Sequence, residues 1–371
     1  MSTKPTIALA GGTSRFDQVL SRLEHFNTIF YPVPATKEEL FKDCLPGGPL
    51  ANVEGLFCSW PAFYAMGGLK TEEEIAQLPA SLKVVALCAT GYDQFNVAAF
   101  RKRGIIVTNT PSMEPSHSGE QVADIALYLS IGCMRKIPLF EGSFQREKNS
   151  IDARRVVAQG EFDPASGQVL GGPPSGFAFG DLTAKGPARM CRNRAVGVAG
   201  LGNIGKAIVR RLAPLGVEIH YYKRSELSAE ELAASNLPSD LIFHSSFDDL
   251  CAASDQLILA LPGGADTLNI VNKRTLNLMP RGASIVNIGR GTLINEDDLL
   301  EALGSKQIAT AGLDVQVGEP FVNPKLFGRW DIQLLPHLGS GTEDNALAAE
   351  LNVIDNIENV LNGGPGLHPV N

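Results

Sequence analysis

The stretch VGVAGLGNIGKAIVRRLAPLGVEIHYYKRSE, residues 196–226, decides the fold of this 371-residue chain. Its pattern predicts an apolar strand, a glycine-rich turn, an amphipathic helix and a second apolar strand. The turn has the form G-x-G-x-x-G, and the residues expected to line a bound dinucleotide there are Gly200, Gly202, Asn203, Ile204 and Gly205. Such a glycine pattern alone is a weak signal. Because this one follows a strand and opens a helix, it indicates a dinucleotide-binding unit.

Each glycine has its own physical role in a turn of this kind. Gly200 allows the sharp turn, Gly202 lets a pyrophosphate approach the backbone, and Gly205 lets the helix pack closely on the strand. Free N–H groups at the start of the helix, together with the helix dipole, hold the phosphates. The alternative interpretation is a plain glycine turn between a strand and a helix.

The end of the second strand predicts which dinucleotide is bound. A site for NAD carries Asp or Glu about 20 residues beyond the glycines, where it accepts hydrogen bonds from the ribose hydroxyls. This chain has Lys223, Arg224 and Ser225 there, and the nearest acid is Glu226. Cations attract a 2′-phosphate, and arginine can contact it with two N–H groups at once. We therefore expect NADP(H) to be preferred, with NAD(H) possible, unless the two cations only mark a solvated strand end.

The composition limits the class of function. With 44% hydrophobic residues and 38 glycines, a chain of this length suits two α/β domains. A net charge of −8 argues against a nucleic-acid partner. Neither a membrane-spanning segment nor a signal peptide is expected from the apolar runs. The six cysteines are too scattered for a zinc site or a redox pair. We expect a cytoplasmic protein with reduced thiols and no metal.

Two α/β regions are expected along the chain. In the first, strands are predicted at 6–10, 53–58, 82–88 and 104–109, and helices at 16–26, 36–44 and 71–78. In the second, strands are predicted at 195–200, 217–222, 256–261, 283–288, 308–314 and 331–335, and helices at 204–213, 247–253, 295–304 and 343–361. Thr71 and Glu74 form a capping-box pattern at the start of one helix.

The two regions are joined by a long connection. A helix is expected at 119–137, followed at 140–193 by an insertion rich in glycine, proline and charge. We expect this insertion to be mostly loop, with one helix near 151–159. Structureless loops of this length are uncommon and are often functional or packed on a partner. Covering a subunit interface is the role we favour over catalysis.

Three polar side chains follow predicted strands of the second region. Arg290 lies just past one strand, Glu319 comes five residues after Asp314, and His337 lies just past another strand. Because ligands bind at the carboxyl ends of parallel strands, the three side chains could face one cleft. Taken singly, each fits a plain role: Arg290 in a solvated loop, Glu319 as a turn acid and His337 as a structural histidine.

At this point the sequence resembles the D-isomer-specific 2-hydroxyacid dehydrogenase family over most of its length. The motifs that carry the resemblance are GLGNIG, LALPGGADTLNIVN, VNIGRGTLINEDDL, AGLDVQVGEP and LLPHLGS. In pattern it is similar to NADP-using glyoxylate and hydroxypyruvate reductases and to fungal D-mandelate-type dehydrogenases. The resemblance implies an α/β protein of two Rossmann- or flavodoxin-like domains with parallel sheets, a cleft between them, and a homodimer. The substrate domain would comprise 1–112 and 340–371, and the dinucleotide-binding domain 113–339.

The resemblance also implies roles for single residues. Arg290 would bind the carboxylate and carbonyl of the substrate, His337 would donate or accept the proton, and Glu319 would partner the histidine. The motif LCATGYDQFN would hold the substrate carboxylate with backbone amides of Ala89, Thr90 and Gly91. Further cofactor contacts are expected at Val122, Leu261, Pro262, Ile288, Gly289 and Asp314.

These residue types suit the implied reaction, the NAD(P)-dependent reduction of a 2-oxo acid to a D-2-hydroxy acid. The carbonyl carbon receives a hydride from the nicotinamide, and the growing alkoxide needs a proton. Histidine titrates near working pH, and a neighbouring carboxylate favours its protonated form. An arginine fork fits a carboxylate and polarises the adjacent carbonyl.

Two stretches bear on the details of the site. SMEPSHSGEQ, residues 112–121, is longer than the family pattern, which puts the cofactor contact at Val122 in doubt. Trp60, Phe63 and Tyr64 follow the strand at 53–58 and could wall a pocket that favours a bulky or aromatic substrate side chain over glyoxylate. Ordinary packing against the neighbouring domain explains the three aromatics equally well.

Two other classes of protein share many of these motifs. A formate dehydrogenase of the same superfamily pairs the histidine with glutamine, so Glu319 argues against that activity. A corepressor-like protein that senses nucleotides on the same fold keeps all three polar side chains. The acidic net charge and the lack of basic tails favour the enzyme over that non-enzymatic alternative.

Overall fold

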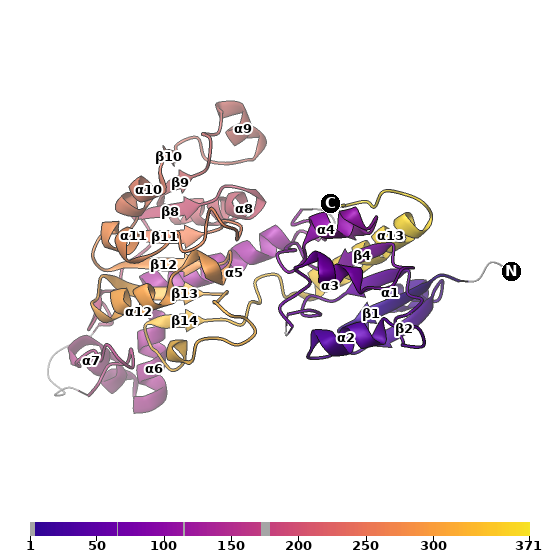
Figure 1. Cartoon of the computed structure of the whole chain (residues 1–371). Coiled ribbons are helices and arrows are strands. Elements are labelled where there is room, and N and C mark those ends of the chain that lie inside the picture. Colours follow the sequence, from indigo (N-terminus) through magenta and orange to yellow (C-terminus); the bar gives the residue numbers. More distant parts are fainter. Residues whose placement is uncertain (1–3, 65, 114–115, 172–178) are drawn as a thin grey trace. The chain divides into compact units, whose positions relative to one another are not determined.

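The computed structural model describes residues 4–64, 66–113, 116–171 and 179–371. The chain divides into two compact units, each with its own sheet (Figure 1). Unit 1 comprises Met1–Ser118 and Gly341–Asn371, and unit 2 comprises Gly119–Ser340. Parts of the 112–121 segment and of the insertion, residues 114–115 and 172–178, lie outside the described residues.

Unit 1 is a five-stranded parallel sheet with helices on both faces, and its strand order is β2-β1-β3-β4-β5. Its strands are β1 (Thr6–Ala10), β2 (Asn27–Tyr31), β3 (Gly55–Cys58), β4 (Val84–Leu87) and β5 (Ile106–Thr108). Its helices are α1 (Asp17–Leu23), α2 (Lys37–Asp43), α3 (Glu72–Ala76), α4 (Val97–Lys102) and α13 (Glu343–Leu361). This strand order is that of the flavodoxin-like folds.

Both faces of this sheet are buried, because successive side chains of each strand point to opposite sides. In β1, Ile7 and Leu9 join the core under α1 and α13, whereas Ala8 and Ala10 join the core on the other face. Helix α13, yellow in Figure 1, packs on β3, β4 and β5 although it comes from the end of the chain. Burial on both faces explains why these strands read as continuous apolar runs.

In unit 1, the predicted capping box is present, whereas one strand was not predicted. The capping box at α3 is confirmed, since the side chain of Thr71 accepts the N–H of Glu74 and the Glu74 carboxylate accepts the N–H of Thr71. The sequence did not predict β2, which lies at the edge of the sheet and leaves Phe30 55% exposed. An edge strand buries too little surface to produce a long apolar run.

Unit 2 is a seven-stranded parallel sheet in the order β10-β9-β8-β11-β12-β13-β14, which is the Rossmann order. Its strands are β8 (Ala195–Ala199), β9 (Glu218–Tyr222), β10 (Ile242–His244), β11 (Gln256–Leu259), β12 (Ala283–Asn287), β13 (Ile308–Leu313) and β14 (Ile332–Leu334). The helices around it are α5 (Ser118–Met134), α8 (Asn203–Leu212), α9 (Ala229–Ala234), α10 (Phe247–Ala253), α11 (Lys273–Leu278) and α12 (Glu296–Gly304). The two sheets confirm the predicted α/β class with Rossmann- and flavodoxin-like units.

The insertion is more ordered than the sequence suggested. The expectation of a loop is wrong for its first part, where α6 (Ile137–Glu147) pairs with α7 (Ser150–Gln159). The helix expected near 151–159 is confirmed as α7. A small separate core of Leu139, Val157, Phe162 and Val169 stabilises the pair, and β6 (Leu182–Thr183) and β7 (Gly186–Pro187) form a short hairpin after it. These apolar residues are too widely spaced along the chain to form a periodic pattern.

The six thiols are free, as expected, and four of them are buried. Burial raises the pKa of the Cys44 thiol to about 11 and that of Cys251 to about 12, so both remain protonated. Among the residues that the structure describes, no helix combines the length and the apolarity needed to cross a bilayer.

Candidate active site

The glycine turn of unit 2 has the predicted strand–turn–helix context. Gly200 follows β8 with φ +94°, a conformation that disfavours any side chain. A Cβ on Gly205 would collide with the carbonyl oxygen of Gly200, so helix and turn approach as closely as the pattern predicts. A Cβ on Gly202 would meet no described atom within 4 Å, and Gly202 caps α8 without a side-chain hydrogen bond. Open space therefore borders Gly202 at the start of α8.

The tip of β9 carries the cations expected to select the dinucleotide. The N–H of Gly200 donates to the carbonyl of Tyr222 at 2.9 Å, which joins the glycine turn to the residue before Lys223. Arg224 and Ser225 are exposed, and Lys223 is half-buried. In the described part of the chain, neither cation has an ion-pair partner, and Glu226 has none either. The two cations are thus uncompensated beside the turn.

The loops after β11 and β12 lie against each other. A Cβ on Gly289 would lie 2.6 Å from the carbonyl oxygen of Leu261, and a Cβ on Gly263 would lie 3.1 Å from the side chain of Arg290. The predicted cofactor contacts at these two strand ends are Leu261, Pro262, Ile288 and Gly289. Ile288 and Gly289 directly precede Arg290 in the chain, and Leu261 lies in the loop packed against them.

Asn287 holds the Arg290 loop, and the sequence analysis missed this function. Its side-chain amide donates to the carbonyl of Arg290 at 2.8 Å and accepts the N–H of Gly289 at 3.1 Å. The guanidinium of Arg290 also donates to the carbonyl of Gly289 at 2.8 Å. The signal was present in the sequence, since an asparagine that ends a buried strand needs partners for its amide.

Glu319 and His337 form a hydrogen-bonded pair. Nδ1 of His337 lies 2.7 Å from Oε2 of Glu319, and both side chains are mostly buried, with 21% and 15% exposed. The other carboxylate oxygen of Glu319 accepts the N–H of Gln316 at 2.8 Å, a second contact that the sequence did not predict. Nδ1 is thus the ring nitrogen that faces the carboxylate.

The electrostatics of Glu319 show that Arg290 belongs to the same group. Burial alone would raise the pKa of the Glu319 carboxyl. The hydrogen bond and positive charge of His337, the N–H of Gln316 and the charge of Arg290 outweigh burial and lower this pKa below its ordinary value. The structure therefore brings the three predicted catalytic side chains together within unit 2.

Asp314 positions the turn that carries His337. Its carboxylate accepts the N–H groups of Leu338 and Gly339, each at 2.9 Å, and its carbonyl accepts the N–H of His337. Burial raises the pKa of Asp314, although these N–H groups and His337 oppose the shift. A Cβ on Gly339 would touch both Asp314 and Val122, so α5 also borders this turn. The expected cofactor contacts of Asp314 and Val122 remain predictions.

The loop after β4 in unit 1 has the backbone features of an anion cradle. The carbonyls of Ala89 and Thr90 accept hydrogen bonds from Thr110 and from the Asn109 amide. Within the described ranges, the N–H groups of Ala89, Thr90 and Gly91 donate to no protein acceptor. The loop is held in place through its carbonyl groups. Its N–H groups make no hydrogen bond to the described protein, so they could donate to the oxygens of a carboxylate.

The three predicted aromatics border this same loop. A small hollow of about 30 Å³ in unit 1 is lined by Trp60, Phe63 and Tyr64 together with Ala89 and Gly91. Trp60 and Tyr64 face each other with ring centroids 5.1 Å apart, and Trp60 is 42% exposed. Phe63 is only 2% exposed and packs edge-on against Phe95, so its main role is in the core.

The fold and the site define an α/β protein with a dinucleotide-type glycine turn and a carboxylate–imidazole pair at the carboxyl ends of a parallel sheet. Residues 180–339 match the family model described as D-isomer specific 2-hydroxyacid dehydrogenase, NAD binding domain. The chain is also 30% identical over 369 residues to glyoxylate reductase 1 of Saccharomyces cerevisiae, with 97% of this chain and 93% of the relative covered.

Two solved structures are similar over nearly the whole chain. The NADPH-dependent glyoxylate/hydroxypyruvate reductase of Sinorhizobium meliloti, solved with NADP and malonate, has a TM-score of 0.72 at 28% identity and covers 99% of this chain and 97% of its own. The holo form of Rhodotorula graminis D-mandelate dehydrogenase has a TM-score of 0.80 at 24% identity, with 99% and 98% covered, which is a likeness of fold. The chain belongs to the D-isomer specific 2-hydroxyacid dehydrogenase family, as its motifs predicted, and is an oxidoreductase of that class.

Proposed function

We propose that this protein reduces a 2-oxo acid to a D-2-hydroxy acid, with NADPH as the preferred hydride donor and His337 as the proton donor. The observation that carries the proposal is the 2.7 Å contact between Nδ1 of His337 and Glu319. Arg290 is close enough to act on the charge of the same carboxylate. The bound cofactor would supply the hydride at the substrate carbonyl carbon.

The proton transfer follows from the hydrogen bond of His337. The carboxylate of Glu319 favours the imidazolium and fixes the ring, so that Nε2–H can protonate the alkoxide that forms at the carbonyl oxygen. In the oxidation direction, the neutral imidazole would accept the hydroxyl proton at the same atom. Arg290 would hold the substrate carboxylate and stabilise the developing negative charge, because its guanidinium donates in a planar fork.

We propose two further contacts. In unit 1, the substrate domain of this proposal, the unused amides of Ala89, Thr90 and Gly91 would bind the substrate carboxylate. In unit 2, the dinucleotide-binding domain, Lys223 and Arg224 would bind the 2′-phosphate of NADPH, as expected of uncompensated cations at the end of β9. The similar enzyme of Sinorhizobium meliloti is named as NADPH-dependent, which supports this preference. We also expect a homodimer, which light scattering would test.

The test of the proposed function is the consumption of a reduced nicotinamide, followed by absorbance. NADPH and NADH are each compared with glyoxylate, hydroxypyruvate and phenylpyruvate. We expect turnover with NADPH and at least one 2-oxo acid. Formate oxidation without 2-oxo acid reduction would instead assign a formate dehydrogenase. Nucleotide binding without turnover of any substrate would assign a binding protein.

Trp60 is expected to select the larger substrates. Replacing it by alanine removes one wall of the hollow beside Ala89 and Gly91. Because an aromatic contact contributes about 1 kcal/mol beyond burial, Trp60→Ala should lower the kcat/KM ratio of phenylpyruvate to glyoxylate by about 5-fold. Phe30→Ala, which changes an exposed aromatic on β2, is the matched control. An unchanged ratio in Trp60→Ala would leave Trp60 with a packing role only.

Glu319 is expected to set the alkaline limit of the reductase activity. The interaction that lowers the pKa of Glu319 is made with the positively charged imidazole, so the same interaction favours the imidazolium. Glu319→Gln keeps a hydrogen-bonding group but removes the charge. The pH at which kcat/KM for reduction declines, measured with saturating NADPH, should therefore fall. A pH profile identical to that of the unchanged protein would exclude Glu319 from this role.

A further inference from the structure

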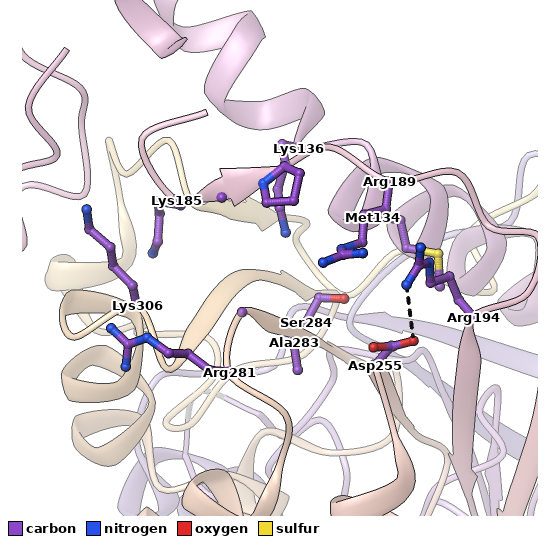
Figure 2. A pocket seen from close by; sticks show the side chains of 13 residues that line it. Met134, Lys136, Lys185, Arg189, Arg194, Asp255, Arg281, Ala283, Ser284 and Lys306 are labelled. Carbon is purple, nitrogen blue, oxygen red and sulfur yellow. Dashed lines mark ion pairs between the residues drawn. The ribbon is translucent and has the colours of Figure 1, made fainter. Parts of the chain in front are cut away.

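Unit 2 contains a second cavity that the proposed reaction does not use. It has a volume of about 300 Å³, and Figure 2 shows the side chains that line it. Residues just before β8, β11, β12 and β13 line it, namely Arg194, Asp255, Gly282 and Lys306. These four strands are neighbours in the sheet, so the cavity lies along their amino ends. The glycine turn and the Glu319–His337 pair lie at the carboxyl ends.

The lining of this cavity is strongly cationic. Six of the residues that line it are basic: Lys136, Lys185, Arg189, Arg194, Arg281 and Lys306. One acid, Asp255, lines it as well, and its nearest contact with Arg194 is 3.9 Å long. Such an excess of positive charge is notable in a chain with a net charge of −8.

Two of the six cations are explained by the end of a helix. Lys185 donates to the carbonyl of Leu303 at 2.8 Å and pairs with the buried Asp331 at 2.7 Å. Arg281 donates to the carbonyl of Ser305 at 2.8 Å. Both acceptors lie at the C-terminal end of α12, Leu303 in its last turn and Ser305 as its C-cap, where cations are favoured by the helix dipole. These contacts do not involve the remaining four cations.

Lys136 is the decisive residue. Its side chain is buried, with 4% of the residue exposed, and no acceptor for its ammonium group occurs among residues 4–64, 66–113, 116–171 and 179–371. Figure 2 shows this group pointing into the cavity, opposite Ser284. The Nε atom of Arg194 is also buried without a hydrogen-bond partner in the described part of the chain. A buried donor such as Nε of Arg194 is normally satisfied by a partner, whereas the Lys136 ammonium opens onto the cavity.

The cations also disfavour one another's charge. Burial, reinforced by Arg189 and opposed by Cys133, lowers the pKa of Lys136 to about 8. Burial, reinforced by Arg329 and Lys136 and opposed by Asp331, lowers the pKa of Lys185 to about 8. A negatively charged ligand would relieve both effects, because it favours the protonated form of each lysine.

We propose that this cavity binds a compact polyanion, a small molecule with at least two negative charges on phosphoryl or carboxylate groups. Lys136 is its central contact, and Arg189, Arg194 and Lys306 surround it. The volume is at the lower end of the range for small-molecule sites, which suits a ligand the size of pyrophosphate or citrate. Because the cavity is at the opposite end of the sheet from the glycine turn, the polyanion and the dinucleotide would bind to one molecule together.

The test is calorimetric titration of the full-length protein with pyrophosphate, citrate and inorganic phosphate, each with and without saturating NADPH. We expect saturable binding of pyrophosphate or citrate that NADPH does not displace. Lys136→Met, which preserves the length of the side chain, should weaken this binding by about 10-fold or more. Lys325→Met, at an exposed lysine of the same unit, is the control and should have no effect. Tighter binding of pyrophosphate or of citrate assigns phosphoryl or carboxylate chemistry, respectively.

A second variant covers the case in which Lys136→Met does not fold. Arg189 is exposed, Lys306 is half-buried, and both belong to the proposed contacts, so Arg189→Gln with Lys306→Gln should leave the fold intact and still weaken polyanion binding by about 10-fold. Near pH 8, binding should also take up protons, seen as heats that depend on the buffer. Displacement of pyrophosphate by NADPH would overturn the proposal. So would the absence of saturable binding, or an equal loss of affinity in Lys325→Met.

Discussion

His337→Asn should lower kcat for 2-oxo acid reduction by about 10²–10⁴-fold, the usual contribution of a positioned acid–base group. His337 has φ +54°, a left-handed conformation that asparagine tolerates well. The variant therefore removes the imidazole without straining the turn that Asp314 holds. The affinity for NADPH, measured by fluorescence titration, should change little because the glycine turn is untouched.

Two controls make the His337→Asn experiment specific. His25→Asn, at an exposed histidine of unit 1 that lies 3.4 Å from Glu358, should keep full activity. Adding Glu319→Gln to His337→Asn should cost little more than His337→Asn alone, because Glu319 acts through the imidazole. Full activity in His337→Asn would end the proposed mechanism, even if NADPH still bound.

The second large effect concerns the choice of cofactor. Lys223→Asp combined with Arg224→Ala should raise the Kd of NADPH by about 10²–10³-fold, since two charge-assisted hydrogen bonds are lost and a repulsive charge is gained. The Kd of NADH should stay within a few fold of its starting value or fall. An aspartate at the end of β9 can accept hydrogen bonds from the ribose hydroxyls that NADH carries there.

The chain supplies a matched control for this variant. Lys273 and Arg274 are another Lys-Arg pair of unit 2, exposed on α11 and paired with Glu301 and Asp248. Lys273→Asp with Arg274→Ala makes the same change of charge away from the glycine turn. It should leave both affinities unchanged. Equal losses for NADPH and NADH in the Lys223 and Arg224 variant would show that these cations do not recognise the 2′-phosphate.

The sequence predicted the inner strands of both sheets and the edge strands β5 and β14, and it missed the edge strands β2 and β10. Inner strands are buried on both faces, so they appear as unbroken apolar runs. Most residues of the edge strands β2 and β10 are exposed or only partly buried. These two strands therefore do not appear in the sequence as unbroken apolar runs. Helix α6 was missed for a related reason, because it packs on α7 and a small local core rather than on a large sheet.

The same contrast applies to the two sites of unit 2. Arg290, Glu319 and His337 could be chosen from the sequence because each follows a strand of a parallel sheet, and carboxyl ends of parallel strands share one edge. The pairing of Glu319 with His337 at 2.7 Å, the support from Asn287 and the contacts of Asp314 needed the structure. Hydrogen bonds depend on ångström-scale placement, which a pattern of residue types does not contain.

By itself, the sequence determined the α/β class, the glycine turn, the cationic end of β9 and the three polar side chains, because each depends on neighbours close along the chain. Only the tertiary structure decided that Lys136, Lys185, Arg194 and Lys306 line one cavity. These residues come from segments far apart in the sequence. The order of the strands places them side by side, and strand order results from the packing of helices on both faces of the sheet rather than from any local pattern.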